Sequence, residues 1–339
     1  MITKMYDDRN HERSSSLEKL FNDLNTQTCS YNSVRFLSYR IALKVRALIT
    51  KFKLVYVDYK IALFQLNQEG IAFGSQFVLP IERVRHIIRT IYQSLPPVHF
   101  TDISIKDLTE GLCAVFARIL DNDRSNSSQF DSDSFKLVFF SLLNMNLTLK
   151  YMYLYQMMCF PSSTISVSQV RLIFKIMAKI AMCLDNNIND VDSYAETLVD
   201  GILCKAAHKS IDKSTFLDFL NDRPLELEWM HSLHTLLLCA TVRHEAQCDV
   251  CGTYPIIGIR FRCLCCFDYD LCATCHFLGS FSKDHLPGHE IQQLTKQVKP
   301  YEDFKAFVEI IRRRLLRSSL FSSKYKTLTF NRTNSENSS

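Results

Sequence analysis

The sequence predicts a mainly α-helical protein, in which a helical body is followed by a small cysteine-rich module with a short β-hairpin and by one more helix. Two observations predict the body: apolar residues recur at helical spacing along most of the chain, and only 8 glycines occur among 339 residues. The cysteines predict the module, because seven of the 13 lie between Cys248 and Cys275. The helical body has enough apolar residues for its own core and should fold without the module.

Composition indicates a globular protein of a reducing compartment. Hydrophobic residues make up 47% of the chain and charged residues 22%. No apolar run approaches the roughly 20 residues of a membrane-spanning helix, and the polar N-terminus lacks a signal-peptide core. We therefore expect a cytoplasmic protein whose clustered cysteines bind metal rather than form disulfides. The formal net charge of +5 is too small to predict nucleic-acid binding.

Helices are expected from residue 32 onward. Residues 32–50 place apolar side chains three and four positions apart, with Asn32 or Ser33 available as the N-cap. Ser104 and Asp107 have the spacing of a capping box that begins another helix. These signals predict helices over residues 32–50, 57–68, 81–95, 104–120, 134–147, 168–184, 192–207, 214–220 and 225–242, with connections between them.

One acidic loop between two predicted helices was compared with the calcium-binding EF-hand loop. Asp121, Asp123 and Ser125 fit its first, third and fifth positions. The sixth position, normally glycine, is Asn126, and the twelfth, normally a bidentate glutamate, is Ser132. We therefore expect no calcium here and a degenerate EF-hand that serves as scaffold.

The module contains four pairs of potential metal ligands: three Cys-x2-Cys pairs and then one His-x3-His pair. Each pair can turn two ligand atoms toward one ion, so eight ligands suffice for two tetrahedral zinc ions. If the second and third cysteine pairs shared an ion, they would have to face each other across only five residues. Alternate pairing combines the first pair with the third and the second with the fourth, and it leaves intervals that are usual in zinc sites. The predicted sets are Cys248, Cys251, Cys272 and Cys275 for the first zinc, and Cys263, Cys266, His285 and His289 for the second.

Such zinc ions are expected to be structural. A catalytic zinc keeps an open coordination position, whereas here the protein supplies all eight ligands. The histidine pair disfavours an iron–sulfur cluster. Cys265 and His276 are left over, and we expect Cys265 to be a spare small side chain and His276 to point away from the ions.

Two stretches of the module are expected to pair as strands. Residues 255–262 (PIIGIRFR) alternate apolar and basic side chains, and residues 267–272 (FDYDLC) supply the partner strand. Asp268 and Asp270 fall on one face of this second strand, which we expect to be the outer one. They form a candidate contact for a cationic peptide, although charges that only solubilise the strand would fit the pattern equally well.

The ends of the chain are expected to differ from the body. Residues 1–31 are polar and predict a flexible lead-in, residues 298–322 predict an amphipathic helix, and residues 323–339 predict a disordered tail. The helix could contact a membrane surface or an acidic partner, or pack on its own domain. Its basic side carries Arg312, Arg313, Arg314 and Arg317.

The ligand pattern, with PIIGIRFR and CFDYDLCATC, resembles the ZZ-type zinc finger of the dystrophin family, which includes dystrophin, utrophin, the dystrobrevins and dystrotelin. SVRFLSYRIALKVRALITKFKL resembles the start of that family's first EF-hand-like region, LELEWMHSLHTL its entry into the finger, and KPYEDFKAFVEIIRRRLL the helix after it. The resemblance implies EF-hand-like domains over residues 32–150 and 151–242 that do not depend on calcium, then a ZZ finger over residues 243–297. Family ligands carry over onto the same eight cysteines and histidines.

The resemblance implies a non-enzymatic scaffold at the cytoplasmic face of the plasma membrane, associated with it only peripherally. In the family this module helps to dock the dystroglycan cytoplasmic tail and joins it to cytoskeleton and signalling adaptors. The chain departs from dystrophin because a WW domain needs two tryptophans and Trp229 is the only one here. Without spectrin-like repeats or a coiled coil, the short layout is most similar to dystrotelin or to a truncated dystrophin-like protein.

Two other functions stay open. The module could read cationic N-terminal peptides through Asp268 and Asp270. A RING-type ubiquitin ligase also has interleaved zinc sites, but it would need another cysteine pair where this chain has His285 and His289. No nucleophile–base pair, phosphate-binding loop or redox motif predicts any other enzyme.

Overall fold

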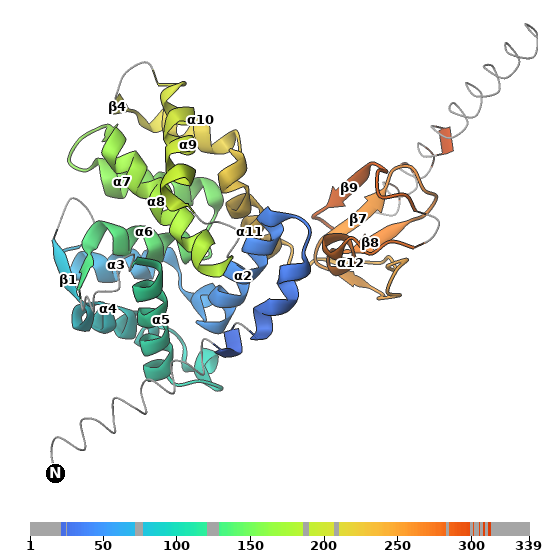
Figure 1. Cartoon of the computed structure of the whole chain (residues 1–339). Coiled ribbons are helices and arrows are strands. Elements are labelled where there is room, and N and C mark those ends of the chain that lie inside the picture. The colour runs from blue at the N-terminus through green and yellow to red at the C-terminus, as the bar shows by residue number, and fades with distance from the viewer. Residues whose placement is uncertain are drawn as a thin grey trace, which may run out of the picture. The chain divides into compact units, whose positions relative to one another are not determined.

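A computed structural model of the protein describes residues 22–24, 26–71, 77–120, 129–185, 190–206, 210–282 and 285–298, together with residues 301, 305, 308, 311 and 312. The chain forms two compact units, Met1–Leu237 and Leu238–Ser339. Figure 1 shows that the first unit is built mainly of helices and that the second contains short strands and the short helix α12 (Ala273–Leu278). The EF-hand-type loop at 121–128 lies outside the described residues, as do most of the lead-in and most of the expected helix at 298–322.

The helices α2 to α11 form most of the first unit (Figure 1), and residues 22–24 and 26–29 before them are also helical. Their bounds are α2 Leu37–Lys51, α3 Tyr59–Gln68, α4 Ile81–Gln93, α5 Ile105–Leu120, α6 Ser132–Leu142, α7 Leu147–Cys159, α8 Val167–Leu184, α9 Val191–Leu203, α10 Lys213–Asn221 and α11 Glu228–Leu238. The mainly helical fold predicted from the sequence is confirmed.

Short antiparallel strands join the helix–loop–helix segments in pairs. Strand β1 (Val78–Pro80), just before α4, pairs with β2 (Gln129–Asp131), just before α6. Strand β3 (Ile165–Ser166), before α8, pairs in the same way with β4 (Ser210–Ile211), before α10. Each strand pair thus links two loops that are far apart in the sequence, and it does so through backbone hydrogen bonds.

Polar side chains begin most of these helices. As predicted, Ser104 begins α5, because the N–H of Asp107 donates to its hydroxyl at 3.0 Å. Ser166 and Gln169 form a full capping box at α8. Four aspartates accept hydrogen bonds from first-turn N–H groups of α3, α6, α9 and α10, and these are Asp58, Asp131, Asp190 and Asp212.

The first helix starts later than the periodicity predicts. Residues Ser30–Ser33 form a 3-10 turn, and Val34 is extended with φ −65° and ψ 123°. Helix α2 begins at Leu37 with Phe36 at the N-cap position and no side-chain cap. The prediction of Asn32 or Ser33 as N-cap is therefore wrong, because the extended backbone at Val34 interrupts the helical hydrogen bonds.

Helix α7 was missed in the sequence because a charged residue occupies its buried face. Lys150 is only 4% exposed, and its ammonium donates to the carbonyl of Ser141 at 2.7 Å. Tyr151, Leu154 and Tyr155 continue the same buried face at helical spacing. Lysine normally lies on the solvent side of a helix. Because Lys150 lies on the buried side, the apolar periodicity of α7 cannot be recognised from the sequence.

Aromatic side chains form the centre of the helical core. Phe116 of α5 packs edge-on against Phe135 of α6 with ring centroids 5.6 Å apart, and Phe135 stacks on Phe139 at 5.9 Å. Phe174 of α8 and Phe216 of α10 stack at 6.5 Å. All five rings are at most 1% exposed. Ring packing therefore joins α5 to α6 in one cluster and α8 to α10 in another.

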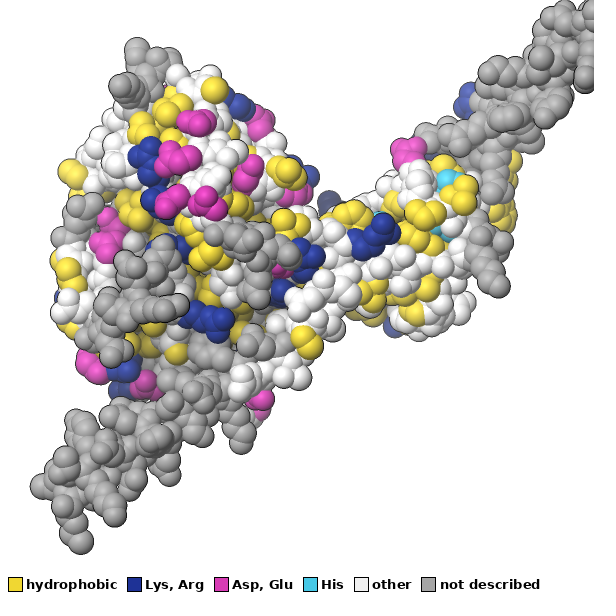
Figure 2. Space-filling model, in the orientation of Figure 1, with side chains coloured by type: hydrophobic (Ala, Val, Ile, Leu, Met, Phe, Trp, Pro, Cys, Tyr) yellow, Lys and Arg dark blue, Asp and Glu magenta, His cyan; other side chains and the backbone are white. Residues whose placement is uncertain are grey.

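The surface of the helical unit mixes charges of both signs (Figure 2). Ion pairs join Arg171 of α8 to Glu196 of α9 and Lys175 to Asp192. Such exposed pairs contribute little stability, about 0–1 kcal/mol each. Among the described residues, none of the helices has the length and apolar character needed to cross a membrane.

The second unit is a small three-stranded sheet with a helix beside it in the chain. Strand β7 (Arg260–Cys263) is central, between β8 (Asp270–Cys272) and β9 (Ile291–Leu294), and both neighbours are antiparallel to it. Helix α12 (Ala273–Leu278) follows β8 directly, and a separate pair joins β5 (Arg243–His244) to β6 (Ile256–Ile257). The predicted hairpin is present as β7 and β8.

The first strand of this hairpin differs from the prediction. Gly258, with φ 97°, separates β6 from β7, and its N–H donates to the carbonyl of Val242 at 2.8 Å. The expected single strand over 255–262 is therefore split, because a left-handed residue breaks the pleat. The third strand, β9, was not predicted, since IQQL has no clear apolar alternation.

Candidate metal centre

Two groups of ligand atoms converge in the second unit. Within each group, the nitrogen and sulfur atoms all lie within 4.8 Å of one another. The groups are Cys248, Cys251, Cys272 and Cys275, and Cys263, Cys266, His285 and His289. These are the two sets obtained from alternate pairing of the ligand pairs in the sequence.

The distances between donor atoms match tetrahedral zinc. Ordinary zinc bond lengths place two sulfurs about 3.8 Å apart and a sulfur and a nitrogen about 3.6 Å apart. Cys251 Sγ and Cys272 Sγ are 3.8 Å apart. In the second group, Nδ1 of His289 lies 3.2 Å from Cys266 Sγ and 3.7 Å from Cys263 Sγ, and Nδ1 of His285 lies 3.5 Å from Cys266 Sγ. The sulfur–sulfur distance is far too long for a disulfide.

Backbone amides stabilise the thiolates that such a site needs. The N–H groups of Cys265 and Cys266 donate to Cys263 Sγ at 3.3 and 3.1 Å, where β7 ends in a tight turn. Cys272 is the N-cap of α12, and its sulfur accepts from the N–H of Cys275 at 3.5 Å. The turns at Cys263 and Cys272 thereby direct amide dipoles at the first sulfur of the pair.

The turn from Cys248 to Cys251 needs a left-handed residue. Gly252 supplies it with φ 72°, and its N–H donates to the carbonyl of Cys248 at 2.8 Å. Hydrogen bonds with the hydroxyl and backbone of Thr253 lower the pKa of the Cys251 thiol to about 6. Burial raises the pKa of the thiols of Cys272 and Cys275. The positive charge of a bound ion would stabilise their thiolates.

The imidazole of His285 is held against an aromatic ring. His285 is 4% exposed, and its ring stacks on Tyr269 with centroids 4.5 Å apart and planes within 4°. Burial and then the neighbouring His289 lower the pKa of His285 below its usual value. A neutral imidazole is the form that binds zinc, so the environment favours a ligand over a charged surface histidine.

Comparison with known proteins assigns modules to the chain. An EF-hand model matches residues 18–143, another EF-hand model matches residues 147–237, and the ZZ-type zinc finger model matches residues 242–287. Dystrophin-1 of Caenorhabditis elegans is 25% identical over 317 residues, which cover 91% of this chain and 8% of that protein. Dystrophin isoform B of Drosophila melanogaster is 26% identical over 305 residues, covering 87% and 18%. Human dystrotelin is 32% identical over 126 residues, covering 37% and 21%.

Over most of its length the chain is similar to proteins of the dystrophin family. It spans less than a fifth of the length of the dystrophins that it matches. The EF-hand and ZZ modules predicted from the sequence are confirmed, and none of the matched models is that of a catalytic family. The ZZ match and the two ligand groups fit two structural zinc ions, with four protein ligands for each.

One strand of the ZZ finger touches both ligand groups. Tyr269, just before β8, stacks on His285, and its carbonyl accepts from the N–H of Cys263 at 2.9 Å. The carbonyl of the next residue, Asp270, accepts from the N–H of Asp249 at 2.9 Å, and the N–H of Asp270 donates to the carboxylate of Asp249 at 2.6 Å. Asp249 lies between Cys248 and Cys251. A shift of β8 would therefore displace ligands of both groups.

Asp270 itself is enclosed. It is 4% exposed, and its two carboxylate oxygens each accept from the guanidinium of Arg260 at 2.7 Å, with Arg262 at 3.8 Å. The expectation that Asp270 lies on an outer face is wrong, because β7 supplies two buried arginines opposite it. Asp268 is exposed, with φ 44°, so the predicted peptide contact now rests on Asp268.

The two leftover residues have structural neighbours outside both ligand groups. His276 stacks on Phe261 of β7, with centroids 3.8 Å apart. The sulfur of Cys265 belongs to neither group. Three contributors to the site were missed in the sequence, namely Asp249, Arg260 and Tyr269. No spacing rule identifies them, since they act through strand register rather than as ligands.

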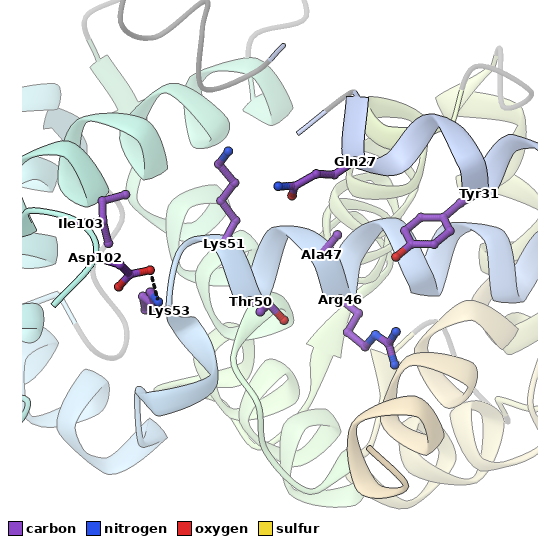
Figure 3. Close-up of a pocket in the computed structure, with 9 residues that line it drawn as sticks. All are labelled: Gln27, Tyr31, Arg46, Ala47, Thr50, Lys51, Lys53, Asp102 and Ile103. Atoms are coloured by element: carbon purple, nitrogen blue, oxygen red, sulfur yellow. Dashed lines mark hydrogen bonds and ion pairs between the residues drawn. The ribbon is translucent and has the colours of Figure 1, made fainter. Parts of the chain in front are cut away.

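A polar hollow of about 520 Å³ lies elsewhere, in the helical unit (Figure 3). Its three cationic side chains do not converge. Figure 3 shows Arg46 and Lys51 pointing in opposite directions from α2, while Lys53 is paired with Asp102 at 2.9 Å. This arrangement does not build a site for an anion.

Proposed function

We propose that the chain is a non-enzymatic scaffold of the dystrophin-associated complex, peripheral at the cytoplasmic face of the plasma membrane. Its zinc-stabilised module binds a protein partner of the dystroglycan-tail type and connects it to the cytoskeleton. The observation that carries this proposal is that both ligand groups of the ZZ finger are complete in protein donors. Zinc with four protein ligands organises a binding surface rather than catalysing a reaction.

Each ligand has a defined role in this proposal. Cys248, Cys251, Cys272 and Cys275 hold the first zinc, and Cys263, Cys266, His285 and His289 hold the second. Because the binding free energy of structural zinc is also folding free energy, loss of one ligand unfolds the finger around its ion.

Zinc content tests the ligand assignment. The protein should contain two zinc ions per chain, and Cys263→Ser should contain fewer and expose apolar surface. Cys265→Ser is the matched control, because Cys265 lies two residues away and belongs to neither group. Equal zinc content in the Cys263 and Cys265 variants would refute the assignment.

Calorimetric titration with a dystroglycan cytoplasmic-tail peptide tests the partner. The zinc-loaded chain should bind it with a Kd of about 1 μM or tighter, and Cys263→Ser should not bind while Cys265→Ser should. If the zinc-loaded chain does not bind the peptide, the family scaffold serves another partner.

A second candidate function is the recognition of cationic N-terminal peptides. Burial, and then the charges of Asp270 and Asp268, raise the pKa of Asp249. A protonated N-terminus would relieve this repulsion. Asp268→Ala should weaken binding of a peptide with a free N-terminus, and an acetylated peptide of the same sequence should not bind. Equal binding of the free and acetylated peptides would exclude this function.

A further inference from the structure

The helical unit has an apolar groove that the metal centre does not use. It lies where the N-termini of α2 and α9 meet the 3-10 turn Leu225–Leu227 and α11, and its volume is about 590 Å³. We name it the α2–α9 groove. Its walls and floor include Phe36, Leu37, Ile41, Tyr194, Leu225 and Trp229.

Large apolar side chains at the rim of this groove face solvent. Phe36 is 46% exposed, Leu37 43% and Leu225 84%, whereas Ile41 and Trp229 in the floor are at most 2% exposed. Scattered exposed apolar residues are normal, but several around one hollow mark a binding surface. Trp229 closes the floor of the groove and is 1% exposed, so the rim side chains supply most of the apolar contact area.

The groove is formed before any partner arrives. Arg40 of α2 pairs with Asp185 at 2.6 Å and also donates to the carbonyl of Val34 at 3.2 Å, which fixes the entry into α2. The hydroxyl of Tyr194 donates to the carbonyl of Glu226, which ties α9 to the 3-10 turn. Walls that are already ordered lose little entropy when a ligand binds.

Charge defines the partner. Among the described residues that line the groove, Asp190 and Glu226 carry carboxylates and none is lysine, arginine or histidine. Anionic lipid and acidic peptides would be repelled here, whereas a segment with cationic flanks would be attracted. The apolar floor requires bulky apolar side chains between those flanks.

We propose that the α2–α9 groove binds an amphipathic helical segment of another protein, in which bulky apolar residues are flanked by lysine or arginine. The apolar face enters the groove between Leu37, Leu225 and Trp229, and the cations pair with Asp190 and Glu226. This is the helix-in-groove mode of peptide recognition. It is independent of the ZZ finger and of its zinc ions.

The chain provides its own reporter for the test, because Trp229 in the groove floor is its only tryptophan. Trp229 fluorescence of the full zinc-loaded chain is titrated with a short leucine–lysine amphipathic peptide that lacks tryptophan. A saturable change is expected. The counterpart peptide with glutamate in place of lysine should bind at least about tenfold more weakly.

Variants then assign the binding to the groove. Leu225→Ser should weaken binding about tenfold without affecting the fold, since the side chain is 84% exposed. Glu226→Gln should weaken it about threefold and reduce its salt dependence. Val98→Ser is the matched control, because Val98 is 71% exposed on another element of the same unit and should leave binding unchanged.

Three outcomes would overturn the proposal. One is the absence of a saturable signal, and another is equal binding by the Leu225 and Val98 variants. The third is self-association in sedimentation that Leu225→Ser abolishes, which would assign the groove to a second copy of the chain.

Discussion

Breaking the buried ion pair of the ZZ finger should weaken both zinc sites at once. In Asp270→Asn, the guanidinium of Arg260 loses its charged partner while it stays 5% exposed, and Arg262 beside it is 7% exposed. Asparagine keeps one acceptor oxygen in place of two charged ones. The shape of the side chain is preserved, so the change tests charge rather than packing.

The magnitude follows from the two hydrogen bonds of 2.7 Å that join Arg260 and Asp270. Removing one partner of a buried pair costs about 3–5 kcal/mol, because the other charge is left without compensation. The remaining amide oxygen makes the lower value, about 3 kcal/mol, the appropriate one. Since zinc binding and folding of the finger are coupled, this corresponds to about hundredfold weaker zinc affinity.

Competition with a chromophoric chelator measures the effect for both ions. Asp268→Asn is the matched control, because Asp268 lies two residues away and is exposed. Asp270→Asn should release both ions at lower chelator concentration than the native chain, and the control should not. If the two variants hold zinc equally well, the ion pair does not position β8 and the reasoning fails.

Four further predictions concern the helical unit and the finger. Burial lowers the pKa of Lys150 to about 7, so between pH 7 and 10 the unfolded chain binds a proton that the folded chain has lost. The free energy of unfolding, measured by denaturant titration, should therefore rise with pH in this range. Lys150→Met should remove this pH dependence and raise the free energy of unfolding at pH 6 by about 2 kcal/mol. An unchanged pH dependence in the variant would contradict the prediction. Zinc removal by a chelator should leave the helical circular-dichroism signal in place, and a large loss would show that the helices depend on the finger. Phe135→Ala should cost about 3–5 kcal/mol in thermal unfolding, because the ring is fully buried, and a loss below about 1 kcal/mol would refute its place in the core. Gly258→Ala should lower zinc affinity, because its φ of 97° strains any side chain, whereas Gly288→Ala has open space and should not.

The sequence by itself determined the metal chemistry. Ligand identity and spacing are local properties of the chain, and only alternate pairing leaves reasonable intervals between the pairs. The donor atoms of both sets converge as that pairing predicts. The start of α5 was predicted for the same reason, since the Ser104 cap acts over three residues.

The tertiary structure alone decided which polar groups are buried. From the sequence alone, Lys150 and Asp270 would be assigned to the surface, because charged side chains are normally exposed. They can be buried only where a partner from another segment compensates the charge. For Lys150 that partner is the carbonyl of Ser141, and for Asp270 it is Arg260 on the neighbouring strand. The α2–α9 groove likewise combines three parts of the chain that are distant in sequence: the start of α2, the start of α9, and the 3-10 turn with α11. Such sites depend on long-range packing, which no periodicity in the sequence encodes.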